Sequence, residues 1–352
     1  MNTDKRNLRI LEARQKWERV LSGDLRARAD VMETMSTSDF PILLGAAYGR
    51  ELQQEYAGIA PVWQRFSTRK VVPDFKERNL VDLLGGRAAL DKVKEGSEYK
   101  ARSVKESKRS FKVDKYGNRI PLTWEMLKND ELDAFRNLPQ RLATAARETE
   151  DRVALLPLFN TNATGLNTSF FTGVAAPGTG KLTSENLEKA LENISTRKDS
   201  EGRPIILTGA ILMVPPALEI TARRILNASE IRTTVGDRTT IESNYLAGVV
   251  ELVVNPWLSV VGASMDAIDT TWFVLPSTSS ANPALVTAFL TGEETPDLRV
   301  KSDAGNALGG GSLSPESGSF DDDTIQYRVR HVMGSAPLYS DAVYASTGTA
   351  AS

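Results

Sequence analysis

Residues 138–156, LPQRLATAARETEDRVALL, give the clearest secondary-structure signal in the chain. Apolar side chains recur along this stretch at alternating spacings of four and three, which is the pattern of one face of an α-helix. Pro139 suits the first helical position, and Glu148 and Arg152 can pair one turn apart on the polar side. The stretch therefore predicts a helix over 139–159, about 30 Å long at a rise of 1.5 Å per residue.

Upstream of this helix, residues 68–128 form a basic and poorly apolar stretch. Apolar and polar residues alternate on both sides of 114–118, DKYGN, which is typical of two strands joined by a turn. The sequence predicts a hairpin around this turn, extended backwards over 99–104. A two-stranded ribbon is marginally stable alone in water, so we expect it to lie on another surface, which need not belong to its own chain.

Downstream of the helix, residues 182–300 combine helical and strand patterns in the manner of a compact α+β domain. A capping sequence precedes one predicted helix, and a buried strand at 210–214 leads through two prolines into a second helix. Strands and helices do not alternate regularly, which disfavours a doubly wound sheet. Residues 324–333 alternate polar and apolar side chains and predict a long strand with one apolar face. Further strand-like runs occupy 249–254, 271–275 and 285–290.

The first 66 residues indicate a helical arm. Residues 1–35 place apolar side chains at helical spacing among arginines and lysines, and a second helix is predicted from the SDFP sequence at 38–41 to Gly58. The basic face of the first helix could touch nucleic acid or a membrane surface, but such runs are usually solvated, which favours an arm packed against the body or a neighbour. The apolar positions of the arm include Ile10, Trp17 and Leu21.

The composition excludes several classes of chemistry. The 352 residues include no cysteine and one histidine, which excludes a disulfide framework, a thiolate zinc site and a cysteine nucleophile. His331 lies on the apolar face of its predicted strand, where we expect a core or interface residue rather than a catalytic base. The formal net charge is -2, so the chain is not strongly basic overall, as a dedicated DNA-binding protein would be. Any contact with nucleic acid must therefore be local. We expect a soluble protein of a reducing cytoplasm, without metal or cofactor.

Two loops could be interpreted as ligand sites. Residues 175–183 resemble a phosphate-binding loop, but Ala175 replaces the first glycine and Leu182 replaces the hydroxyl residue, so we expect a flexible connection. Asp321, Asp322 and Asp323 lack the oxygen spacing of a calcium loop, and we expect a solvated loop there. No constellation of residues argues for an enzyme.

The order of these features resembles the major capsid proteins of tailed double-stranded-DNA bacteriophages, whose fold is named for phage Hong Kong 97. The resemblance is carried by SFKVDKYGNRIPLTW at 110–124, the helical stretch at 138–156, and TIQYRVRHVMGSAPLYSDAVYAS at 324–346. It implies an α+β fold with four parts. These are an N-terminal helical arm over 1–66, an extended hairpin loop over 67–128, a peripheral domain with spine helix and returning strand over 129–181 and 301–352, and an axial domain over 182–300.

The resemblance also implies a function. It implies a structural, non-catalytic protein that self-assembles into hexamers and pentamers, closing an icosahedral shell around the double-stranded DNA genome of a phage. The implied location is the virion capsid, after assembly in the bacterial host cytoplasm. The implied partners are portal, scaffold and decoration proteins and, through weak non-specific contacts, the packaged DNA; no membrane is implied. The alternatives are an encapsulin-type cargo shell and, from a different class, a nucleotide-binding enzyme that uses the loop at Gly178–Lys181.

The charge pattern predicts how subunits meet. Residues 92–128 hold 11 basic and five acidic side chains, whereas residues 292–323 hold two basic and eight acidic ones. Opposite charges favour docking of the hairpin of one subunit on the peripheral region of another, while the apolar hairpin residues would supply most of the affinity. The candidate contacts on the hairpin are Lys105, Lys108, Arg109, Phe111, Lys112, Val113, Ile120, Leu122 and Trp124. The candidate contacts on the acidic side are Glu293, Glu294, Asp297, Asp321, Asp322 and Asp323.

Overall fold

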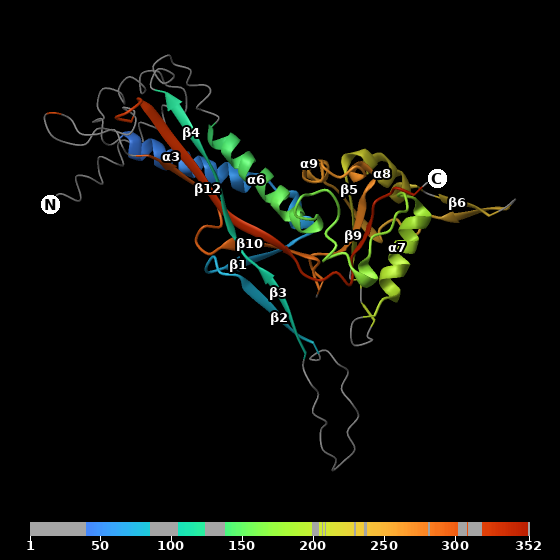
Figure 1. The fold of residues 1–352 in the computed structure, drawn as a ribbon. Coiled ribbons are helices and arrows are strands. Elements are labelled where there is room, and N and C mark those ends of the chain that lie inside the picture. The colour runs from blue at the N-terminus through green and yellow to red at the C-terminus, as the bar shows by residue number, and fades with distance from the viewer. Residues whose placement is uncertain are drawn as a thin grey trace, which may run out of the picture. The chain divides into compact units, whose positions relative to one another are not determined.

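The computed structural model in Figure 1 describes residues 40–84, 105–123, 138–198, 204–205, 207, 209–228, 230–235, 238–280, 282–301, 308 and 319–350. The predicted helix over 1–35, with Ile10, Trp17 and Leu21, lies outside the described residues, as do residues 99–104 and Trp124. The chain forms two compact units. Unit 1 comprises Met1–Ile59, Lys115–Ala146 and Thr295–His331, and unit 2 comprises Ala60–Asp114, Arg147–Glu294 and Val332–Ser352.

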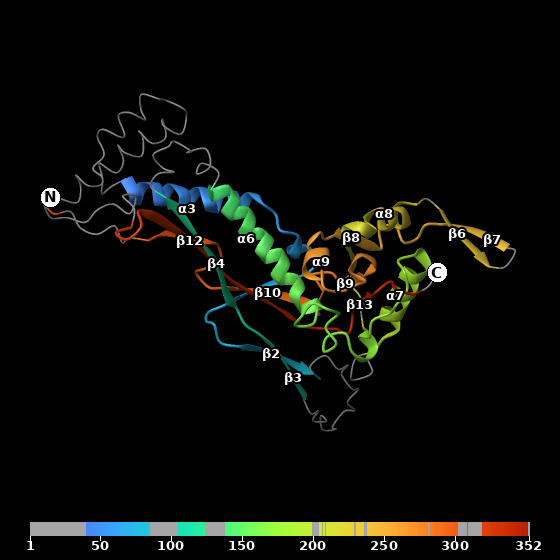
Figure 2. The same cartoon turned by 45° about the horizontal axis from the view of Figure 1, so that its top comes forward.

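Unit 1 is a small sheet with helices on one face. Strands β4 (Asp114–Thr123) and β11 (Asp297–Val300) both pair with β12 (Thr324–Pro337), whose first half belongs to this unit. Helix α3 (Phe40–Gly58) and the beginning of α6 (Leu138–Leu155) pack on the apolar face of the sheet, as can be followed in Figure 2. The core of this unit contains Leu52, Tyr56, Leu142, Ala143 and Ala146, against Ile120, Leu298 and Val329.

The long helix and the long C-terminal strand are confirmed. Helix α6 ends at Leu155 and is followed by a 3-10 turn over Leu156–Leu158 that contains Pro157. Along β12, Tyr327 is buried on the predicted apolar face, and His331 is 4% exposed. The His331 ring lies edge-on to the Tyr56 ring at 5.9 Å between centres, so this histidine is a core residue of unit 1.

The hairpin predicted around residues 114–118 is wrong. These residues lie inside β4, which continues without a break from Asp114 to Thr123. Strand β3 (Lys105–Phe111) pairs instead with β2 (Arg78–Leu84), in antiparallel register. Two consecutive strands that pair with different partners show the same alternation of polar and apolar residues as a hairpin. Gly117 also suggested a turn between them. Gly117 is suited to β4 for another reason, because a Cβ there would lie 2.4 Å from a carbonyl oxygen of β12.

Unit 2 holds a four-stranded sheet and the helices that cover it. Its strand order is β13 (Tyr344–Ser346), β9 (Trp272–Pro276), β5 (Ala210–Val214), β8 (Val250–Val254). Strand β5 is parallel to β8 and antiparallel to β9, and all five of its residues are buried. Helices α7 (Ser184–Thr196) and α8 (Glu219–Asn227) pack against this sheet, and α9 (Trp257–Val261) follows β8. The remaining short turns of 3-10 helix are Val62–Arg65, Gly173–Ala175, Pro216–Leu218 and Ile268–Thr270.

The second sheet of unit 2 joins segments that are distant in sequence. Strand β1 (Thr68–Val72) is parallel to β10 (Leu285–Leu290), and β10 is antiparallel to the second half of β12. The sequence grouped the β10 residues with the segment 182–300 and the β13 residues with 301–352, but β10 pairs with β1 and β12 whereas β13 pairs with β9. The alternation of polar and apolar residues along one segment does not indicate which strands pair. The four-part division of the chain stays a prediction.

Two strand pairs form separate ribbons. Strand β2 pairs with β3, and β6 (Glu230–Val235) pairs with β7 (Arg238–Ser243). Among the strands that the structure describes, neither pair joins a larger sheet. Both ribbons can be followed in Figure 1.

Candidate intersubunit surfaces

The β2–β3 ribbon is anchored at its base in unit 2. Phe111, the last residue of β3, packs against two apolar clusters formed by residues from β1, β10 and β12 and the segment that follows β12. Val113 is 1% exposed in the first of these clusters. The guanidinium carbon of Arg109 lies 4.2 Å from the centre of the Tyr339 ring, which is a cation–π geometry. These contacts fix the base of the ribbon on the rest of unit 2.

The apolar residues predicted to form one docking face are divided between the two units. Phe111 and Val113 pack in unit 2, whereas Ile120 packs in the core of unit 1. Leu122 lies in β4, and Trp124 lies outside the described residues. Because β4 is not the return strand of the ribbon, these residues do not lie along one two-stranded ribbon.

The basic residues predicted on the hairpin lie on or near β3. Lys105 and Lys108 stand opposite Leu84 and Val81 of β2 in the strand register. The Lys112 ammonium is 3.4 Å from the carboxylate of Asp114. Both of these side chains are more than half exposed, so this pair contributes little to stability. The role of these residues in subunit contacts stays a prediction.

The structure describes side-chain partners for Glu294, Asp297 and Asp322 among the predicted acidic contacts. Glu294 forms an ion pair with Arg69 of β1 in unit 2. In unit 1, Asp297 accepts from Arg299 at 2.6 Å and from Arg330 at 3.3 Å. The carboxylate of Asp322 accepts hydrogen bonds from the hydroxyls of Ser319 and Thr324, which lower its pKa. Glu293 is half-buried, and Asp321 and Asp323 are exposed.

A buried polar network joins the turn before β1 to helix α6 within unit 2. The backbone N–H of Trp63 donates to Asp151 at 2.8 Å, and its indole N–H donates to Glu150 at 2.8 Å. Arg147 donates to the same Glu150 oxygen at 3.0 Å. Burial raises the pKa of Asp151 to about 6, against the lowering effect of the hydrogen bond from Trp63. The network holds the chain between α3 and β1 against the long helix.

Sequence reasoning missed this network. Glu148 and Arg152 were expected to define the polar side of the helix, and Glu150 received no role. Glu150 follows Ala146 by four residues and precedes Val153 by three, so it falls on the apolar side of the helix. A carboxylate at that position is a signal of buried pairing, because an unpaired buried charge is costly.

The loop at 175–183 is a hydrogen-bonded connection rather than the flexible one expected. The Gly178 N–H donates to the carbonyl of Ala345 in β13 at 2.8 Å, and the Gly180 carbonyl accepts from the indole N–H of Trp272 at 3.0 Å. Leu182 is buried, and the Thr183 hydroxyl caps α7. The Gly178 N–H, which a phosphate-binding loop would direct at its ligand, is therefore engaged by a strand.

Within the described part of the chain, no group of three or more His, Cys, Asp or Glu side chains is arranged to hold a metal ion. None of the helices in that part has both the length and the hydrophobicity that crossing a bilayer requires.

A family comparison decides the class of protein. The model of a family described as phage capsid protein matches residues 106–346, which is more than half of the chain. The chain belongs to the phage capsid protein family. It is therefore a structural, shell-forming protein of a virion capsid, and its described residues form the mixed α+β architecture that the resemblance implied. The search of curated proteins finds no match.

Solved structures that resemble this chain include capsids and an encapsulin. The capsid of a native GTA particle is 10% identical, covers 82% of this chain and 90% of its own, and has a TM-score of 0.47. The mature capsid of bacteriophage PhiM1 is 12% identical, covers 82% and 87%, and has a TM-score of 0.47. The holo-SrpI encapsulin complex from Synechococcus elongatus PCC 7942 is 13% identical, covers 82% and 88%, and has a TM-score of 0.46.

Proposed function

We propose that this capsid protein assembles into hexamers and pentamers, which close an icosahedral shell around the double-stranded DNA genome of a phage. Assembly takes place in the host cytoplasm, together with portal, scaffold and decoration proteins. The protein performs no catalysis in this role. Its subunits meet through the β2–β3 ribbon of one copy and the peripheral region of another.

The observation that carries this proposal is the β2–β3 ribbon. A pair of strands has only its own hydrogen bonds and needs a surface to be stable in water. The base of the ribbon is fixed in unit 2 by Phe111 and Arg109, and Lys105 and Lys108 lie further along β3. A neighbouring copy in a closed ring is a natural source of the missing surface, since rings repeat one heterologous contact.

An encapsulin-type shell with protein cargo is the alternative within the same architecture. The family match favours a phage capsid, because the matched family is one of phage capsid proteins. The near-neutral chain suits either container, since a strongly basic wall would hold DNA tightly. The contents of the particle therefore distinguish the two functions.

Nuclease protection tests the contents. Particles purified from cells that produce the complete phage are treated with DNase, after which the protected nucleic acid is extracted and sized. We expect long double-stranded DNA that survives until the shell is disrupted. Particles that protect a protein cargo and no DNA would contradict the genome-containing shell.

A further inference from the structure

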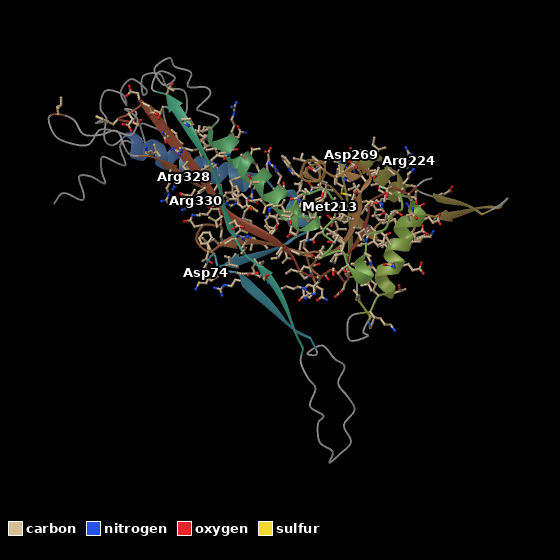
Figure 3. All side chains as sticks on the ribbon, viewed as in Figure 1. Asp74, Met213, Arg224, Asp269, Arg328 and Arg330 are labelled. Atoms are coloured by element: carbon tan, nitrogen blue, oxygen red, sulfur yellow. The ribbon has the colours of Figure 1, made fainter. Side chains whose placement is uncertain are left out.

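The four-stranded sheet of unit 2 has one covered edge and one open edge. At the β13 edge, the N–H of Gly178 donates to the carbonyl of Ala345, and the N–H of Thr347 donates to the carbonyl of Gly178. At the opposite edge, β8 pairs only with β5 among the described strands. Figure 3 shows Met213 of β5 inside unit 2 and Arg224 of α8 at its surface. The sheet can therefore gain a further strand only beyond β8.

The strand register shows which backbone groups of β8 face outwards. Strand β8 is parallel to β5, and the N–H of Asn255 donates to the carbonyl of Val214 at 2.9 Å. In a parallel pair, every second residue of a strand directs both its N–H and its C=O at the partner. The N–H and C=O groups of Val250, Leu252 and Val254 therefore point away from β5.

One side chain covers part of this edge. The carbonyl of Leu252 accepts a hydrogen bond from the Arg65 guanidinium at 2.7 Å, and the same guanidinium forms an ion pair with Glu251. Within the described part of the chain, the outward groups of Val250 and Val254 have no hydrogen-bond partner. The Arg65 side chain is 46% exposed, and an exposed pair of this kind is weak. Arg65 therefore limits uncontrolled pairing in the free chain and can move aside when another strand docks.

An open cavity of about 230 Å³ lies beside the same edge. Its lining includes Val250 and Leu252 of β8, Leu226 of α8, and residues 247–248. A cavity of about 150 Å³ already holds a benzene molecule, so this cavity has room for an apolar side chain of a docked strand. Backbone pairing combined with a side-chain pocket is the arrangement by which an extended segment adds to a sheet edge.

The β6–β7 ribbon has open edges of its own. Among the described strands it joins no larger sheet. Val235 stands opposite Arg238 with two residues between them, so in the next pair, Thr234 and Thr239, the N–H and C=O groups point away from the ribbon. The strand sequences EIRTTV and RTTIES are rich in β-branched residues, which favour pairing in a sheet.

The ribbon is directed away from the β8 edge of its own chain. Its base is fixed on α8, because the Asn244 side chain donates to the carbonyls of Ile225 and Leu226 at 2.8 and 3.3 Å. From this base the ribbon extends away from the sheet of unit 2, as Figures 1 and 2 show. In a ring, each copy offers one surface to the next copy and receives a different surface from the previous one. The ribbon and the β8 edge are two different surfaces that suit this repeat.

We propose that, within each ring, the β6–β7 ribbon of one copy pairs with the open β8 edge of the next copy and places a side chain in the cavity beside it. This inference rests on the proposed ring assembly and adds a second contact to that of the β2–β3 ribbon. The occupant is a second copy of this chain, because a closed ring needs the same contact at every subunit.

Hydrogen exchange tests whether the β8 edge is covered. Peptides that contain residues 249–255 are compared between unassembled full-length protein and closed shells. We expect the amides of Val250, Leu252 and Val254 to exchange more slowly in shells, because each then donates to a neighbouring strand. The matched control is the β5 peptide, whose amides are bonded within the sheet in both states and should change less.

Cross-linking tests which segment covers the edge. The chain has no cysteine, and Val249 is 53% exposed directly before β8. Two double variants, Val249→Cys/Thr234→Cys and Val249→Cys/Thr239→Cys, place one thiol beside the β8 edge and another on either strand of the ribbon. After treatment of assembled shells with a short bis-maleimide, we expect one or both double variants to give covalently closed rings of five and six subunits under denaturing conditions. The three single-cysteine variants are the matched controls and should remain monomeric.

Unchanged exchange of the β8 amides in closed shells would overturn the inference. Slower exchange without a cross-link to the ribbon would show that another segment covers the edge, and cross-linking of Val249→Cys alone would show that two β8 edges meet. Either result overturns the assignment to the ribbon. The proposed function fails separately, if the wild-type protein forms no rings.

Discussion

At the level of single residues, Asp151 is the carboxylate whose environment most clearly affects folding. It is 5% exposed, and its pKa of about 6 exceeds the ordinary value of 3.8 because burial disfavours its charge. The folded state therefore holds this proton between about pH 4 and pH 6, where the unfolded state has lost it. The free energy of unfolding should therefore fall as pH rises through this window. Above the window, Asp151 should cause no further change in stability.

Comparison with Asp151→Asn isolates this effect. The amide oxygen can still accept the Trp63 N–H but carries no charge, so the variant lacks the titration. From pH 4 to pH 7, denaturant unfolding of unassembled protein should show the wild type losing about 2–3 kcal/mol relative to the variant. Stability profiles that run parallel across this range would contradict a raised pKa for Asp151.

Single residues also show the limits of sequence reasoning. The burial of His331 and the helix end at Gly58 were predictable, because both follow from local patterns. The role of Gly117 was not predictable, since the atom that excludes a side chain belongs to Val329, more than 200 positions away in the chain. A glycine in a turn and a glycine under a neighbouring strand look alike in sequence.

At the level of elements, the β2–β3 ribbon carries the prediction about assembly. Lys105→Glu/Lys108→Glu should slow or block shell formation, because it reverses the charge that would guide the ribbon to an acidic neighbour. Arg109 and Lys112 are left unchanged, since they contact Tyr339 and Asp114 within the chain. Light scattering gives the assembly rate, and the wild-type rate should also fall with added salt.

The matched control for the ribbon is Lys181→Glu/Lys198→Glu, which makes the same charge change at exposed positions of unit 2. Each exposed charge pair adds only about 0–1 kcal/mol, so the effect should appear in the rate more than in the final stability. Normal rates for the ribbon variant, together with a salt-independent wild-type rate, would show that charge does not guide docking.

Elements with a long and regular spacing of apolar residues were predictable from the sequence. The strands with which they pair were not. Helix α6 and strand β12 match the expected stretches, because the apolar spacing over each is long and regular. The pairing of β2 with β3, and of β4 with β12, replaced a hairpin that the local pattern equally allowed. The register of a strand is set by packing against its partner, which the strand's own sequence does not contain.

At the level of the whole molecule, the order of the predicted elements indicated the family. Each sheet, however, combines segments that are distant in sequence. Strand β10 pairs with β1 and β12, and β13 pairs with β9. Both sheets therefore combine strands that the sequence analysis assigned to different parts of the chain. The candidate surfaces were affected in the same way. The predicted acidic contacts are partly engaged within the chain, with partners that the sequence alone does not place beside them.

Electron microscopy of the purified full-length protein, with its scaffold where assembly requires one, tests the central claim most directly. A ribbon that needs a neighbouring surface predicts closed shells whose reconstruction shows rings of five and six subunits, with the β2–β3 ribbon of each subunit lying on the next copy. A protein that stays monomeric at high concentration, with the ribbon ordered in isolation, would contradict the account.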